Sequence, residues 1–489
     1  MDQGGARPMG GRSRATVVAV AVLLAATAYA FPLPGVPETG RRLTAVLMVI
    51  ATLWISEALP LAATALLGPA LCVVFGVAPV EKAFGGFGNP LIALFIGSFL
   101  LARVTFKHHL SERIAYGALA LRAVGSDPLR AFLLLGVTTA ALSAWMSNTA
   151  VTAMMLPIAQ AVLLAMIGGE SRRATPTYGA ALMLIVTYSA SVGGLFTPVG
   201  TPPNLIGIGL IEQATGQRIG FGEWVVKVFP VTFACLLIMM AYLSFAFRHE
   251  RLALRYDRAQ MVARYAALGP WRPVEKWVAA ALLSAGVLWI APSLLSLAWP
   301  SAAAFFDNHL PEAVVPVLVT APLFWLHRDR ADDRPILELR DLAEIDWPVV
   351  LLFAGGMCLG QLMIHSGLAQ ALGETLAAYV PVDYRVLTVF MSCALAIAVS
   401  ETASNTASAN MVVPVVMAVS AQVGGDALGL GLAATVACTF GFMLPVSTAP
   451  NAMVYATGYV TQRQMIRYGV VLDCVGVVLL TLWFGLVAR

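Results

Sequence analysis

Two four-residue stretches decide the fold: Ser147-Asn148-Thr149-Ala150 and Ser404-Asn405-Thr406-Ala407. They are identical and lie 257 residues apart. Each interrupts an apolar segment, at 128–166 and 386–423, that is about twice as long as the ~20 residues that one membrane-spanning helix needs. Each segment is therefore either two full crossings or two half-helices that enter and leave the bilayer on one side.

The surrounding sequence repeats in the same order. The stretch 90–97 (PLIALFIG) matches 348–355 (PVVLLFAG), and 197–204 (TPVGTPPN) matches 444–451 (LPVSTAPN). Three matched landmarks in one order indicate an internal duplication. Each half thus pairs one Ser-Asn-Thr motif with one proline-interrupted apolar segment.

Composition places this duplicated chain in a membrane. Of its 489 residues 59% are hydrophobic and only 11% are charged, and the mean hydropathy is +0.82, whereas a soluble domain carries about 25% charged residues. These values exclude soluble, disordered, collagen-like and disulfide-rich secreted proteins. The net charge of +4 is too small to indicate nucleic-acid binding.

Lysine and arginine positions predict the topology, because cytoplasmic loops collect these residues. With both interrupted segments counted as re-entrant hairpins, we expect about 11 transmembrane helices, a cytoplasmic N-terminus and an inner (plasma) membrane location. We interpret the apolar run from Ala15 to Ala30 as an uncleaved first helix, although Ala28-Tyr29-Ala30 resembles a signal-peptidase site. The basic residues left on the opposite side are Arg41, Arg42, Lys82, Arg218, Lys227, Arg385 and Arg489.

This topology makes the two halves inverted, and inverted repeats with broken helices mark the binding sites of secondary transporters. Backbone at a hairpin tip within the membrane needs protein or a cavity around it. Ser, Asn and Thr cap helix N-termini, whose positive dipole ends attract anions. The uncharged tips therefore predict an anion site. The alternative is that both segments are merely kinked helices.

The proline-interrupted segments predict cation sites beside that anion. Pro198, Pro202 and Pro203 cannot continue a helical hydrogen-bond ladder, and Gly200 lets backbone approach closely. The freed carbonyl groups, together with Ser and Asn oxygens, make a cage suited to a small alkali cation. Two copies make two cages around one anion.

These motifs, with Trp54-Ile-Ser-Glu-Ala-Leu-Pro60 and Asp346-Trp-Pro348, resemble the divalent anion/sodium symporter family from about residue 40 to the end. The resemblance implies an all-α polytopic elevator-type transporter of dicarboxylates, citrate or sulfate that forms a homodimer. It implies scaffold parts at 15–125 and 276–384, and transport parts at 126–250 and 385–489. The broken helices are expected at 177–213 and 428–462, the N-terminal tail at 1–14 and a basic cytoplasmic linker at 251–275.

The resemblance also implies ligands for each site. The first sodium site would use Ser143, Ser147, Asn148 and Gly200, and the second Ser400, Ala403, Asn405 and Ser447. Substrate carboxylates would meet Ser147, Asn148, Thr149, Thr201, Pro202, Ser404, Asn405, Thr406 and Thr448. One departure is Ala449, which stands where the family's second copy has proline. We expect this loss to leave the break in place but to loosen it.

Function follows as an expectation with alternatives. We expect sodium-coupled uptake of C4 dicarboxylates such as succinate, malate or fumarate, with Na⁺ as coupling ion and no cofactor. The alternatives are a sodium-independent exchanger, a sulfate or citrate symporter, and an anion channel. An enzyme is not expected, because the apolar segments hold no catalytic dyad. Glu401 lies three residues before the second Ser-Asn-Thr motif, where it either tunes the second cage or pairs with a cation.

Overall fold

Each Ser-Asn-Thr motif lies in a gap between two helices of the computed structural model, which describes residues 11–32, 34–167, 176–250, 256–329, 332–377, 385–423 and 426–487. In the first half, α7 (Pro128–Ser143) ends four residues before α8 (Asn148–Ile167) begins. In the second half, α19 (Arg385–Thr402) precedes α20 (Asn405–Val423). Within each pair, the two helices pack against each other.

The proline-interrupted segments are also broken helices. Helix α9 (Pro176–Gly193) is followed by a loop and then α10 (Pro202–Thr215), which begins on two prolines. Helix α21 (Ala427–Ala437) is likewise followed by α22 (Ala449–Ala456). The order of hairpin and broken helix is therefore the same in both halves.

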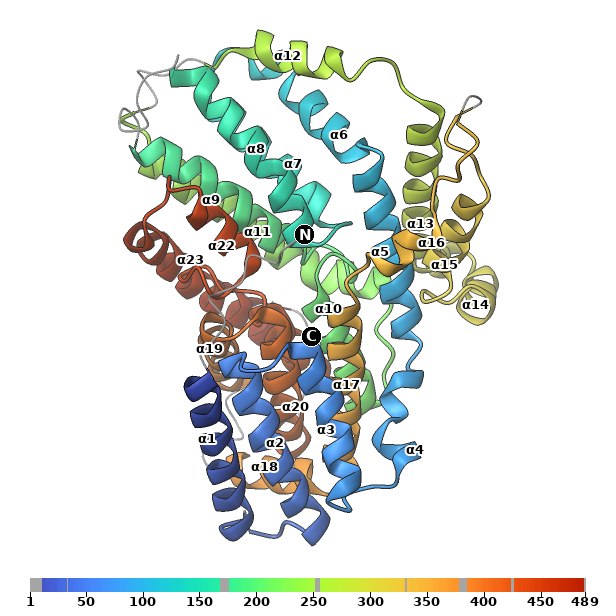
Figure 1. The fold of residues 1–489 in the computed structure, drawn as a ribbon, viewed down its shortest axis with the longest axis vertical. Coiled ribbons are helices and arrows are strands. Elements are labelled where there is room, and N and C mark those ends of the chain that lie inside the picture. Colours follow the sequence, from blue (N-terminus) through green and yellow to red (C-terminus); the bar gives the residue numbers. More distant parts are fainter. Residues whose placement is uncertain are drawn as a thin grey trace.

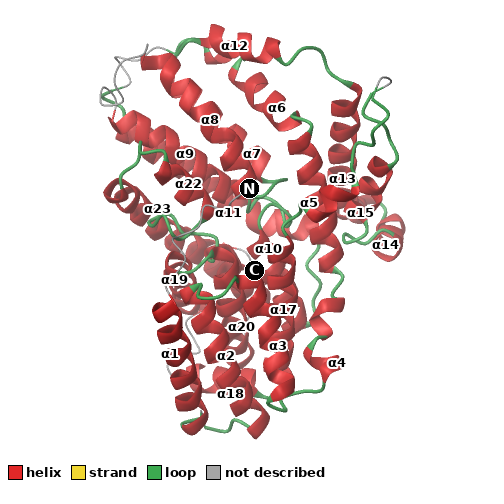
Figure 2. Ribbon diagram, in the orientation of Figure 1, coloured by secondary structure: helices red, strands yellow, loops and turns green. Residues whose placement is uncertain are grey.

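The described chain is helical throughout and has no named strand (Figure 2). The remaining helices are α1 (Gly11–Ala30), α2 (Glu38–Ser56), α3 (Leu61–Val74), α4 (Val80–Ala83), α5 (Leu91–Lys107), α6 (Leu110–Leu119), α11 (Phe221–Ala246), α12 (Arg258–Ala267), α13 (Pro273–Ala298), α14 (Pro300–His309), α15 (Val315–Thr320), α16 (Leu339–Ala343), α17 (Trp347–His365), α18 (Leu368–Ala377) and α23 (Gln462–Leu482).

Several of these helices can cross a bilayer. Within the described residues, six are long and apolar enough for a full span, and the bent pair α5–α6 makes a seventh. Six shorter apolar helices, among them α7, α9 and α21, belong to the broken elements or to the bundle around them. Helix α12, in the predicted basic linker, lies across one end of the molecule, and α18 lies at the other end (Figure 1).

Helix α9 is the centre of the largest hydrophobic cluster. Its residues from Ala180 to Val186 are fully buried, as expected of a helix that is apolar on all sides. A second cluster joins α2 and α3 to α17 and α18. There a Cβ on Gly355 would lie 2.3 Å from the carbonyl oxygen of Ala65, so glycine is what lets α3 and α17 approach.

Candidate functional site

The first hairpin tip is tied to the middle of the first broken helix. The fully buried Ser143 hydroxyl contacts the Asn148 Oδ1 at 2.8 Å and donates to the carbonyl oxygen of Ala190 at 2.7 Å. The Asn148 Nδ2 points the other way, toward the Thr201 Oγ1 at 3.4 Å. The amide oxygen of Asn148 therefore faces the predicted sodium cage, and its N–H groups face the start of α10.

The second tip repeats this arrangement with one difference. The Ser400 hydroxyl contacts the Asn405 Oδ1 at 2.8 Å and donates to the Cys438 carbonyl at 2.7 Å. However, the Asn405 Nδ2 donates to the carbonyl of Thr439 at 3.1 Å and not to a threonine hydroxyl. Asn405 thus has one N–H committed to the backbone, so the two asparagines are not equivalent.

A buried asparagine closes each break. The Asn204 Nδ2 donates to the carbonyls of Gly194, at 2.9 Å, and Thr197, at 2.8 Å. The Asn451 Nδ2 makes the matching bonds to the carbonyls of Gly441, at 2.8 Å, and Leu444, at 3.1 Å. These bonds satisfy carbonyl groups that the proline-broken ladder leaves free, and they fix the shape of each loop.

Backbone and side-chain oxygens crowd together at the first predicted cage. A Cβ on Gly200 would lie 2.5 Å from the Gly194 carbonyl oxygen and 2.8 Å from that of Ser143. A Cβ on Gly194 would lie 2.4 Å from the Asn148 Oδ1. The structure therefore brings Ser143, Asn148 and Gly200 together, as the sequence predicts, while the Ser147 hydroxyl accepts the Ala150 N–H at 3.3 Å and caps α8.

The second predicted cage is built similarly, with an acidic neighbour. A Cβ on Gly441 would lie 3.2 Å from both the Asn405 Oδ1 and the Ser447 Cβ, and 3.4 Å from the Ser400 carbonyl. The Ser447 hydroxyl donates to the Glu401 Oε2 at 2.6 Å. The fourth predicted residue, Ala403, is buried in the connection between α19 and α20.

The alanine at position 449 does not alter the break. Thr201 and Thr448, which precede the two helices, have nearly the same backbone angles, with φ and ψ of −145° and 142° against −143° and 148°. In addition, the Thr448 hydroxyl accepts the Asn451 N–H at 3.1 Å, which is a cap that Thr201 does not form. The break therefore stays in place, as expected, with one added hydrogen bond beside the lost proline, and the loosening stays a prediction.

All nine predicted substrate residues line one cavity of about 200 Å³. Its lining contains the first residues of α8, α10, α20 and α22, which follow the two Ser-Asn-Thr motifs and the two breaks, and also those of α3 and α17. The positive dipole ends of these helices favour a bound anion, although α10 begins on two prolines, which have no N–H group to donate. Pockets for drug-sized ligands measure about 300–1,000 Å³, so this cavity suits a smaller molecule.

Among the residues that the structure describes, no Lys, Arg or His lines this cavity. Its one charged member is Asp346, whose carboxylate accepts the Val349 N–H at 3.3 Å and caps α17. Asp346, Leu352 and Leu61 also line the cavity, and no role was predicted for them. The Asp346-Trp-Pro348 motif, already noted in the sequence, contributes Asp346 and Pro348 to the lining.

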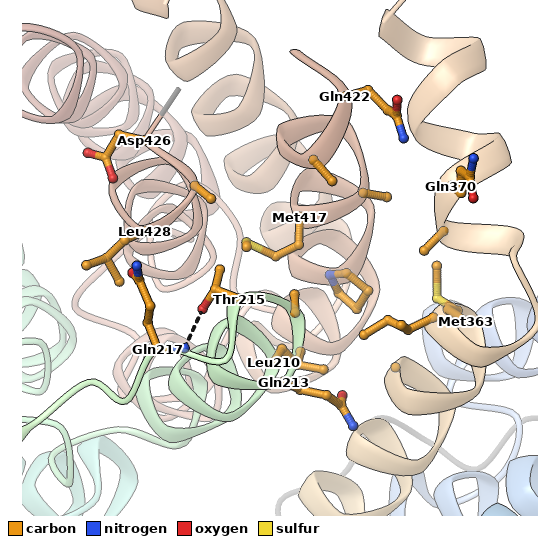
Figure 3. Close-up of a pocket in the computed structure, with 18 residues that line it drawn as sticks. Leu210, Gln213, Thr215, Gln217, Met363, Gln370, Met417, Gln422, Asp426 and Leu428 are labelled. Atoms are coloured by element: carbon orange, nitrogen blue, oxygen red, sulfur yellow. Dashed lines mark hydrogen bonds between the residues drawn. The ribbon is translucent and has the colours of Figure 1, made fainter. Parts of the chain in front are cut away.

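A larger cavity of about 640 Å³ lies apart from this site. It is lined by α10, α17, α18, α20 and α21, and glutamines 213, 217, 370 and 422 project around it (Figure 3). None of the predicted site residues lines it. First-turn residues of α18 and α21 also line it, but its polar wall consists mainly of glutamine amides together with the Asp426 carboxylate, so its chemistry differs from that of the smaller cavity.

Comparisons with known proteins agree with this geometry. The family model of the sodium:sulfate symporter transmembrane region matches residues 12–487. The sodium-dependent dicarboxylate transporter SdcS of Staphylococcus saprophyticus is 29% identical over 467 residues, covering 94% of this chain and 88% of the relative. SdcS of Staphylococcus aureus is 30% identical over 451 residues, covering 91% and 85%.

A solved structure shares the fold. The Alcanivorax borkumensis YdaH transporter superposes with a TM-score of 0.56 over 97% of this chain and 98% of that one, at 16% sequence identity. The family match spans nearly the whole chain, and the duplicated motifs meet at one cavity. The chain is therefore a multi-pass membrane protein that belongs to the divalent anion/sodium symporter family.

Proposed function

We propose that this protein is a secondary active transporter that couples the uptake of C4 dicarboxylate dianions, such as succinate, malate and fumarate, to sodium. One observation carries the proposal: the N-termini of α8, α10, α20 and α22 meet at a small cavity whose described lining residues include no basic side chain. An anion there is held by N–H groups, hydroxyls and dipoles. Relatives named as sodium-dependent dicarboxylate transporters support both ligands.

Sodium coupling is supported by the arrangement of the two cages. In each predicted cage, an asparagine of the Ser-Asn-Thr motif turns its amide oxygen to a serine predicted to bind sodium: Asn148 to Ser143, and Asn405 to Ser400. A cation that fixes the amide oxygen also orients the N–H groups toward the substrate. Such coupling is reciprocal and is typically worth about 1–3 kcal/mol.

We further propose that the protein moves as an elevator within a homodimer in the inner membrane, with its N-terminus in the cytoplasm. The cavity lies where the predicted transport parts, 126–250 and 385–489, meet the predicted scaffold, because Leu61, Asp346 and Leu352, in the predicted scaffold parts, also line it. A ligand held at this boundary can change sides when one part slides past the other.

Uptake into proteoliposomes tests the proposal. With labelled succinate outside, we expect uptake when sodium is present outside and none when choline replaces it. Full uptake without sodium would instead identify the exchanger. Counterflow separates a carrier from a channel, because only a carrier accelerates labelled uptake when unlabelled succinate is loaded inside.

A further inference from the structure

An aromatic stack joins the first hairpin tip to helix α13. Trp145 lies two residues before the Ser147-Asn148-Thr149 motif. Its ring stacks on that of Trp289, with 6.2 Å between the ring centroids and 14° between the ring planes. A Cβ on Gly286, three residues before Trp289, would lie 3.3 Å from the Trp145 ring. The tip of the first hairpin therefore rests on α13 through a tryptophan.

A third ring completes the stack. Phe221, the first residue of α11, lies 5.2 Å from Trp289, with 9° between the planes, and 6.3 Å from Trp145, with 22°. Trp289 is 1% exposed and Phe221 is 2% exposed. The Trp289 ring is thus buried among side chains that come from other elements than its own helix.

Two further contacts hold α11 against α13 at the same place. The Trp289 Nε1 donates to the Glu312 carbonyl oxygen at 3.1 Å, and the Glu312 carboxylate accepts the N–H of Phe221. That N–H is one of the donors that the first turn of a helix leaves free. A Cβ on Gly222 would lie only 1.9 Å from the Ser293 Oγ, so glycine is what lets α11 begin directly against α13.

All of these contacts cross the boundary between the predicted parts of the protein. The hairpin tip and α11 belong to the predicted transport part at 126–250. Helix α13 and Glu312 belong to the predicted scaffold part at 276–384. The stack and the Glu312 hydrogen bond therefore join the part that is proposed to move to the part that is proposed to stay.

The second hairpin has no matching stack. The residue that corresponds to Trp145, at the same 257-residue offset, is Thr402. Its exposed hydroxyl donates to the Val399 carbonyl of its own helix at 3.0 Å. The aromatic contact is therefore an addition to the first half and not a consequence of the duplication.

We propose that Trp145, Phe221, Trp289 and Glu312 form a latch, which holds the transport part against the scaffold in the position seen in this structure and opens when the substrate is carried across. This inference rests on the proposed elevator movement. Rings on opposite sides of a sliding boundary must separate when one side moves. If these residues only stabilised the fold, their loss would lower stability without changing the balance between two positions of the transport part.

The size of the effect follows from the rings that cross the boundary. Two of the three pairs do so, because Trp289 stacks on both Trp145 and Phe221. Trp289→Ala removes both pairs and leaves every predicted sodium and substrate residue in place. Its loss should change the ratio of the two positions by roughly 5- to 150-fold, in favour of the open latch.

The distance between two spin labels reports that ratio in the full-length protein in lipid nanodiscs with sodium and succinate. One label is attached to Cys474, the exposed natural cysteine on α23, since the other five are buried. The second is attached to Trp325→Cys, at a scaffold position that is 83% exposed. We expect Trp289→Ala to lower the fraction of molecules at the wild-type distance. The control Phe233→Ala, which removes a ring stacked on Phe229 within α11, should not.

A second variant opens the latch without removing a ring. In Gly222→Ala the new Cβ collides with the Ser293 side chain, so we expect the same shift as in Trp289→Ala. Adding Ser293→Gly removes the collision and should restore the wild-type distances. This pair decides the question if Trp289→Ala does not fold.

The outcomes separate the latch from the proposed function. Unchanged distances in both Trp289→Ala and Gly222→Ala would refute the latch, and so would an equal shift in Phe233→Ala. Neither result would affect sodium-coupled uptake by the wild type. Sodium-independent succinate uptake by the wild type would instead refute the proposed function.

Discussion

The substitution Asn148→Asp tests whether Asn148 binds both sodium and substrate or only stabilises the local structure. The Asn148 Oδ1 faces Ser143 at 2.8 Å, and its Nδ2 faces Thr201 at 3.4 Å on the cavity side. Aspartate keeps an oxygen for sodium, loses the N–H donors and adds a negative charge. The Ser147 hydroxyl already caps α8, so a change of helix cap does not explain the outcome.

The expected loss of succinate affinity is large. A hydrogen bond to a charged group contributes about 1.5–3 kcal/mol, and two like charges ~4 Å apart repel by about 4 kcal/mol at an effective dielectric constant of 20. The sum of about 6 kcal/mol corresponds to a ~10⁴-fold weaker affinity. Succinate binding should therefore vanish in Asn148→Asp, with some sodium affinity retained.

Calorimetric titrations of the purified variants measure both ligands. Sodium is titrated at fixed succinate concentration, and succinate at fixed sodium concentration. Asn148→Ala serves as the matched comparison and should weaken both ligands, because it removes the oxygen and the donors together. Near-native succinate binding by Asn148→Asp would show that the substrate site lies elsewhere.

Three further predictions concern the cages and the charge of the substrate. Gly194→Ala should weaken sodium binding more than Gly441→Ala. The new Cβ would lie 2.4 Å from the Asn148 Oδ1 in the first variant and 3.2 Å from the Asn405 Oδ1 in the second. Sodium titrations of the two variants test this, and equal effects would count against the first cage. Succinate uptake should follow the abundance of the dianion between about pH 5 and 7, because the first negative charge raises the pKa of the second succinate carboxyl group above the ~4 of an isolated one, and the described lining residues include no Lys, Arg or His. Initial rates at fixed total succinate test this, and rates that follow the monoanion would contradict it. Sodium at 100 times its Kd should stabilise the folded protein by about 2.7 kcal/mol. Replacing the sodium with choline should therefore lower the Tm, and an unchanged Tm would argue against sodium binding at the cages.

The sequence predicted the broken elements well because their signals are local. Prolines 198, 202 and 203 force the first break wherever the chain folds, and α10 begins at Pro202. The duplicated Ser-Asn-Thr motifs likewise marked both gaps between helices. Each prediction needed only residues close together in the sequence.

What the sequence did not predict depends on contacts between distant residues. The Glu401 carboxylate accepts the N–H groups of Met443 and Leu444 in the loop after α21, and no motif links these positions. The Asn405 Nδ2 turns to the Thr439 carbonyl, although the matching Asn148 faces a threonine hydroxyl. The Thr448 cap beside Ala449 likewise becomes visible only in the folded loop.

One titration tests the central claim most directly, namely that the anion cavity and the sodium cages work as one site. Succinate is titrated calorimetrically into the purified protein in sodium chloride, and then in choline chloride at the same ionic strength. The account predicts saturable binding in sodium, and in choline an affinity lower by at least the 5- to 150-fold that is typical of coupled sites. Equal succinate affinity in both salts would contradict it.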